Sequence, residues 1–110
     1  NYYIKSNGEK VNVEFINDLE TLSKMADMDK KTLFIATWSL SESPIEFRDS
    51  FLSKISPTDY LIAYQKSFDG IDNIKYFSEL KNKSVNIEWN TETVSDNIKD
   101  KNIYLFGKQK

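Results

Sequence analysis

The stretch "TLFIATWSLSESPIEFRDSFLSKISPTDYLIAYQ", residues 32–65, decides the fold. It holds two apolar runs, at about 32–38 and 59–65, of the kind that forms strands buried on both faces of a parallel sheet. Between them, Ser43 is a plausible N-cap, Pro44 suits the first helical position, and a glutamate follows at the capping-box spacing. A strand, a helix and a second strand predict a right-handed parallel crossover.

The same alternation continues on both sides of this unit. The last two predicted strands follow one another without a helix, so we expect them to pair antiparallel at one edge of the sheet. The sequence thus predicts an α/β fold, mostly parallel, with a terminal antiparallel strand pair. The further elements are strands at about 11–16, 84–89 and 102–108 and helices at about 18–27, 44–55 and 73–82.

Length and composition bound the classes of function. A chain of 110 residues indicates a single domain, 1–110, and its net charge of −2 without a basic stripe argues against nucleic acid as a partner. No apolar run approaches the roughly 18 residues that span a bilayer, so no membrane partner is expected. The chain has no Cys and no His, which excludes Ser–His and thiol catalysis and the common zinc sites. The lack of Cys fits a cytoplasmic protein.

Two stretches are candidates for a site. Ligands in open α/β sheets bind beyond the carboxyl ends of the strands. That rule selects Thr37–Glu42, after the second strand, and Tyr64–Asn73, after the third. Most of these residues also have ordinary structural roles: Trp38 suits packing with its indole N–H on an acceptor, and Asp72 suits capping of the third helix.

The other polar residues of these stretches have equally ordinary explanations. Serines at a strand-to-helix turn commonly satisfy backbone groups, and a lone carboxylate near a helix start commonly serves the helix dipole. The residues in question are Ser39, Ser41, Ser43, Glu42, Tyr64 and Gln65.

The two stretches carry a resemblance to a known family. "FIATWSLSESP" and "DYLIAYQKSFDGIDNIKYF" resemble the carboxyl-terminal half of bacterial sugar O-methyltransferases, which are class I S-adenosylmethionine-dependent enzymes of Rossmann-like fold. The resemblance covers about residue 32 to the end and implies a partial Rossmann-like three-layer sandwich. Its matching residues are Thr37, Trp38, Ser39, Leu40, Ser41, Glu42, Tyr64, Gln65, Phe68, Ile71, Asp72, Asn73, Tyr76 and Phe77.

The resemblance implies specific chemistry. Glu42 would be the catalytic base that accepts a proton from a sugar or glycan hydroxyl, and Trp38 would stack on the sugar ring. S-adenosylmethionine would be the cofactor of the intact protein, but this chain lacks the Gly-rich cofactor loop, so we expect no tight binding and no activity from it alone. The implied substrate-binding residues are Thr37, Trp38, Ser39, Ser41, Tyr64, Gln65, Phe68, Asp72 and Asn73.

Such a chain would be the carboxyl-terminal half of a longer methyltransferase, which fits a start at Asn1 without Met. Without the other half, the strand at 32–38 would expose an apolar edge. We therefore expect it to pair directly with the strand at 11–16 or with a second copy in a homodimer. The alternative function is a stand-alone, non-catalytic α/β binding or interaction domain. A response-regulator-like phosphoacceptor is less favoured, because Asp59 lies at the start of its strand.

Overall fold

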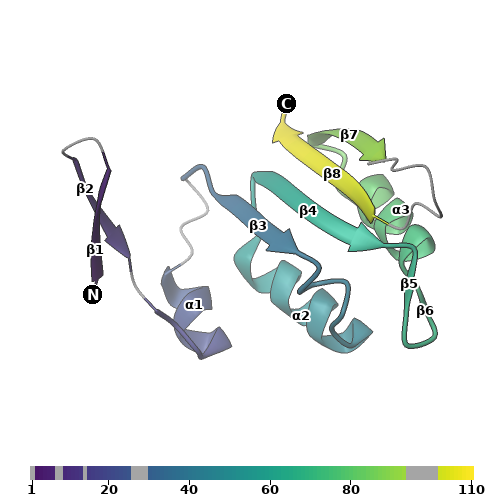
Figure 1. The fold of residues 1–110 in the computed structure, drawn as a ribbon, viewed down its shortest axis with the longest axis horizontal. Helices are drawn as coiled ribbons and strands as arrows, with labels where there is room; N and C mark the ends of the chain where they lie inside the picture. The colour runs from purple at the N-terminus through teal and green to yellow at the C-terminus, as the bar shows by residue number, and fades with distance from the viewer. Residues whose placement is uncertain (1, 7–8, 14, 26–29, 94–101) are drawn as a thin grey trace.

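The structure is a computed structural model, and it describes residues 2–6, 9–13, 15–25, 30–93 and 102–110 (Figure 1). Strands and helices alternate along most of this chain, as the sequence predicts. In order, the elements are β1 (Tyr2–Ser6), β2 (Glu9–Val13), α1 (Leu19–Met25), β3 (Leu33–Thr37), α2 (Ile45–Ile55), β4 (Asp59–Gln65), β5 (Ser67–Phe68), β6 (Ile71–Asp72), α3 (Asn73–Lys83), β7 (Ile87–Thr93) and β8 (Asn102–Gln109).

Four strands form the main sheet, in the order β3-β4-β8-β7. β3 and β4 are parallel and are joined through α2, which confirms the predicted crossover. β8 is antiparallel to both of its neighbours, β4 and β7, so the predicted terminal antiparallel pair is confirmed as well. The sheet is a mixed one rather than the mostly parallel sheet that the apolar runs predicted, because β8 inserts between strands that share a direction.

The hydrophobic core lies on one face of this sheet. Ile62, Leu105 and Phe77 are fully buried there, and α2 and α3 lie over the same face. The opposite face carries Leu33 and Ile35, which are 59% and 58% exposed. Among the described residues the sheet and its helices thus form two layers, not the three that were predicted, because both crossover helices pack side by side.

A tryptophan closes the core at the β7 edge. The ring of Trp89 lies 5.0 Å from that of Tyr60 and crosses the backbone of β8 at Gly107. A Cβ atom at Gly107 would come within 2.7 Å of the Trp89 ring, so only glycine allows this contact. The indole Nε1 of Trp89 is buried and has no hydrogen-bond partner within the described part of the chain.

The amino-terminal strands form a sheet of their own. β2 pairs antiparallel with β1, from Tyr2 opposite Val13 to Ser6 opposite Glu9, and this hairpin lies beyond α1 at one end of the molecule (Figure 1). The prediction that the strand at 11–16 pairs directly with β3 is therefore wrong. The alternation of apolar residues there identified a strand but contained no information about its partner.

The predicted N-cap residue is found at α3, and at α2 the N-cap lies one residue later than predicted. Asp72 caps α3 by accepting from the backbone N–H of Lys75 at 3.0 Å, as predicted. At α2 the cap position is Pro44, and the predicted cap Ser43 instead donates its hydroxyl to the carbonyl of Ser39 at 2.7 Å. No helix among the described residues is long and apolar enough to cross a membrane.

Candidate functional site

The carboxyl ends of β3 and β4 bring several of the predicted site residues together. The loop after β3 carries Trp38, Ser41 and Glu42, and β4 ends at Gln65. Gln65 joins the two segments, because its side chain accepts from the Ser41 hydroxyl at 3.1 Å and donates to the Glu42 carboxylate at 3.2 Å. Through Gln65 the two stretches selected from the sequence are in contact at this end of the sheet.

Trp38 turns the chain at the end of β3. Its φ of 65° lies in the left-handed region, which is uncommon for a residue with a side chain. Several bonds hold this conformation: its N–H donates to the Ala63 carbonyl at 2.7 Å, and its carbonyl accepts from the Ser41 hydroxyl at 2.9 Å. The indole N–H donates to Asn102 Oδ1 at 3.1 Å, as expected for a half-buried tryptophan.

Arg48, which the sequence analysis did not single out, organises the interior of this region. Its side chain is fully buried and donates to the carbonyls of Ser41 at 2.6 Å and Ser43 at 2.9 Å, and to Asn73 Oδ1 at 2.8 Å. The guanidinium also lies over the ring of Tyr76, 4.8 Å from its centre. Burial lowers the pKa of this guanidinium. Arg48 thus ties the loop after β3 to the start of α3.

Several predicted substrate-binding residues are buried and have their contacts within the protein. Ser41 and Asn73 are fully buried, and Tyr64 is 3% exposed with its ring against Phe77. Asn73 donates its amide to the Gln65 carbonyl at 2.9 Å. In this arrangement Ser41 and Asn73 hold the loop through hydrogen bonds within the protein, and Tyr64 packs in the core.

The remaining predicted residues lie at the surface. Thr37, Ser39, Glu42 and Asp72 are exposed, and Phe68 is partly buried. Glu42 and Phe68 share a cavity of about 300 Å³. Its other lining residues are Ser43, Pro44, Ile45, Glu46, Asp69 and Ile71.

The electrostatics of this region are those of a structural network. Tyr76 donates its hydroxyl to Asp49 Oδ1 at 2.9 Å, and burial together with this bond raises the pKa of Tyr76 far above its ordinary value. No group of three or more metal-binding side chains occurs in the described part of the chain. These bonds between described residues hold the loop after β3 against α2 and α3.

A second candidate lies along the outer edge of β3. Trp38 donates its N–H to Ala63, and Asp59 donates to the Thr32 carbonyl, so the even-numbered residues of β3 pair with β4. In a parallel pair the alternate residues direct their N–H and C=O groups the other way. Leu33, Ile35 and Thr37 therefore face an edge that carries no strand among the described residues.

An apolar cavity of about 360 Å³ opens beside this edge, between α1 and α2. Leu22 and Met25 of α1 form one wall, and Phe51 and Ile55 of α2 form the other, with Phe34 of β3 at the base. Lys30 and Lys31 stand at the start of β3. This edge combines unpaired backbone groups with apolar side chains, which is the composition of a strand-addition site.

Comparison with known proteins gives one curated relative. Over 101 residues the chain is 28% identical to a probable periplasmic serine endoprotease, DegP-like, of Rickettsia prowazekii. The match covers 89% of this chain but only 19% of that protein, so the chain spans about a fifth of the relative's length. No family model and no solved structure matches the chain.

This relative corrects the expectations that came from the family resemblance. The assignment to sugar O-methyltransferases, with its sugar-methylating function, is wrong on this finding, because the relative is named as a serine endoprotease. The expected cytoplasmic location is wrong for the same reason, since the relative is named as periplasmic. Nothing tests the expectations of S-adenosylmethionine, a sugar substrate or a stand-alone binding domain, and the first two lose their basis with the family.

Proposed function

We propose that this chain is the part of a DegP-like serine endoprotease that holds an extended polypeptide, by adding it as a strand to the open edge of β3. The observation that carries the proposal is the row of unpaired backbone groups at Leu33, Ile35 and Thr37. Strand addition uses such groups for affinity and uses pockets for alternate side chains to select the sequence. An unfolded polypeptide is also the natural substrate form for an endoprotease.

The side chains of the edge suit a polypeptide with apolar residues. An added strand would place alternate side chains on the two faces of the sheet. On one face they would lie beside the exposed Leu33 and Ile35. On the other they would approach the cavity between α1 and α2, whose walls include Leu22 and Phe51.

Peptide cleavage would belong to residues outside this chain. A Ser–His–Asp triad needs an imidazole as its base, and the 110 residues contain no His. Under this proposal the chain holds the polypeptide and another part of the protein cuts it.

The strand order also bears on the arrangement of the whole sheet. We infer that the sheet is part of a Rossmann-like arrangement, supported by the β3–α2–β4 crossover and by the antiparallel β8 inserted beside β4. In such an arrangement the sheet continues beyond β3, and under this proposal the added polypeptide is the strand that continues it. A bound polypeptide or a second copy of this chain, as in the predicted homodimer, would use the same edge.

Amide hydrogen exchange, followed residue by residue by NMR, tests the proposal. The probe is a short peptide of alternating valine and threonine with a lysine at each end. We expect it to slow exchange at Leu33, Ile35 and Thr37, which lie on the open edge, and to leave Thr91 on the β7 edge unchanged. Mass spectrometry should recover the peptide intact.

Two results would count against strand addition. One is unchanged exchange at all three β3 residues at saturating peptide, and the other is equal slowing at both edges. Light scattering without peptide tests whether a second copy of the chain binds this edge instead. A dimer whose β3 amides are already protected from exchange would mean that it does.

A further inference from the structure

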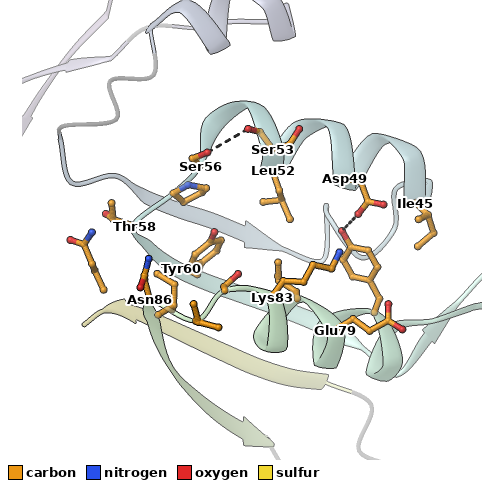
Figure 2. A pocket seen from close by; sticks show the side chains of 17 residues that line it. Ile45, Asp49, Leu52, Ser53, Ser56, Thr58, Tyr60, Glu79, Lys83 and Asn86 are labelled. Atoms are coloured by element: carbon orange, nitrogen blue, oxygen red, sulfur yellow. Dashed lines mark hydrogen bonds between the residues drawn. The ribbon is translucent and has the colours of Figure 1, made fainter.

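A cavity of about 740 Å³ lies between α2 and α3, on the helix-covered face of the sheet (Figure 2). Its apolar surface comes from Leu52 of α2, Leu80 of α3, Tyr60 of β4 and Ile87 of β7. This volume is in the range of small-molecule sites, and the apolar side chains converge from four different elements. The cavity is separate from the β3 edge and from the loop after β3.

Tyr60 presents its hydroxyl group to this cavity. The residue is only 7% exposed, yet its hydroxyl makes no hydrogen bond to any described residue. Among the described residues only the Trp89 indole N–H is sealed from solvent without a partner, so the Tyr60 hydroxyl reaches the open space of the cavity. Figure 2 shows Tyr60 beneath α2 among the lining side chains. Its ring is fixed by Trp89 at 5.0 Å and by Phe34 at 6.2 Å, so the hydroxyl has a defined position.

The charges around the cavity favour a cation. Asp49 and Glu79 supply two carboxylates, against the single ammonium of Lys83. The carboxyl-terminal ends of both helices also border the cavity, at Ser56 for α2 and Ser84 for α3. Helix carboxyl ends carry partial negative charge and unpaired carbonyls, which attract cations.

We propose that this cavity binds a small organic cation, a primary amine on an aromatic or alicyclic body. The ring of the ligand packs against Leu52, Tyr60 and Leu80, and the ammonium group donates a hydrogen bond to the Tyr60 hydroxyl oxygen. The surplus of carboxylates and helix ends supplies the field that selects the charged amine over a neutral molecule of the same shape. This site does not depend on strand addition at β3.

Calorimetric titration of the whole chain with 2-phenylethylamine tests the site, with 2-phenylethanol as the neutral molecule of the same shape. We expect saturable binding of the amine and at least about tenfold weaker binding of the alcohol, because a hydrogen bond that involves a charged group contributes more than a neutral one. Raising the salt concentration should weaken the amine and leave the alcohol unchanged.

Two variants make the test specific to the cavity. Tyr60→Phe keeps the ring and should lower the affinity for the amine about tenfold, because it removes only the hydroxyl. Glu79→Gln, at an exposed position, should lower it a fewfold, whereas Glu46→Gln on α2 lies outside the cavity and should leave it unchanged. Equal binding of alcohol and amine, no binding of the amine at millimolar concentration, or full affinity in both Tyr60→Phe and Glu79→Gln would overturn the proposal.

Discussion

The two edges of the four-stranded sheet differ in how they meet solvent. β7 exposes Glu88, Asn90 and Glu92, so carboxylates stand along that edge. β3 exposes Leu33 and Ile35 and places no charge between them. Proteins commonly discourage edge pairing with charged residues. This difference is the one that the proposed strand addition at β3, and not at β7, would require.

The largest expected effect concerns the anchoring of β3. Arg48→Met removes the donors that bind the carbonyls of Ser41 and Ser43 and the side chain of Asn73. The Ser41 carbonyl then keeps only the long bond from the Asn73 amide at 3.4 Å, and the Ser43 carbonyl and Asn73 Oδ1 lose the bonds that Arg48 made to them. We expect the free energy of unfolding to fall by about 3 kcal/mol or more, measured by urea denaturation.

Lys54→Met is the matched control for this change, because Lys54 is exposed on the same helix. It should alter the free energy of unfolding by less than about 0.5 kcal/mol. A similar loss in both variants would mean that the Arg48 network does not anchor the loop after β3.

A pair of prolines compares the two edges directly. Ile35→Pro removes an N–H that faces the open side of β3. Thr91→Pro does the same at β7. The N–H of Lys110 donates to the carbonyl of Asn86, so the even-numbered residues of β7 pair with β8 and the N–H of Thr91 faces the open side. Ile35→Pro should weaken binding of the valine–threonine peptide at least about tenfold, because it removes one backbone hydrogen bond to the peptide and distorts the bonds on either side. Fluorescence anisotropy of a labelled peptide measures both.

Thr91→Pro should leave the peptide affinity within about twofold of the unsubstituted chain, as expected for a distant site. Ile35→Thr keeps the N–H and changes only the side chain, so it separates backbone pairing from apolar contact. Should Ile35→Pro bind as well as Ile35→Thr, the edge does not act through its backbone.

Removing the charges of β7 is expected to have a smaller effect. Glu88→Val combined with Glu92→Val gives β7 an apolar edge like that of β3. We expect the double variant to sediment as a larger species than the unsubstituted chain at the same concentration, because the charge repulsion between β7 edges is lost. Glu88→Lys with Glu92→Lys keeps the β7 edge charged and is the control. Sedimentation velocity that shows no change in the valine variant would contradict the role of these charges in preventing edge pairing.

The smallest expected effect is a pH dependence at the start of β4. Asp59 accepts from the backbone N–H of Gln109 at 3.1 Å, and this bond lowers the pKa of the Asp59 carboxyl. Because the folded pKa is the lower one, the stabilisation is complete above the ordinary aspartate pKa of about 4 and is lost as the pH falls through the folded value. Asp59→Asn should flatten this part of the acid unfolding curve, and an unchanged curve would refute it.

Elements with strong local signals could be predicted from the sequence. β4 agrees with its apolar run at 59–65, and α3 begins after Asp72 as its capping chemistry requires. One local signal was overlooked: Asp69-Gly70 lies between Phe68 and Ile71, and it forms the tight turn of the β5–β6 hairpin with φ of 48° and 81°.

Features that depend on distant partners could not be predicted. The helical spacing of Phe47 and Phe51 favours an inner position for both, but Phe47 is 47% exposed and its neighbour Arg48 is fully buried. A charged side chain is buried only where acceptors await it, and those acceptors come from the loop after β3 and from Asn73. The pairing of β2 with β1 could not be predicted for the same reason, because an alternating strand does not specify its partner.

The unpaired indole of Trp89 has a spectroscopic consequence. Its ring contacts Tyr60, and its N–H is sealed from solvent, whereas the other tryptophan, Trp38, is half-buried and bonded to Asn102. The two indoles should therefore emit at different wavelengths, with Trp89 at the shorter. Trp38→Phe would leave Trp89 as the single tryptophan, which can be excited selectively at wavelengths that tyrosine does not absorb, 5.0 Å from the ring of Tyr60, which lines the cavity between α2 and α3. The protein thus contains its own optical probe for whatever enters that cavity.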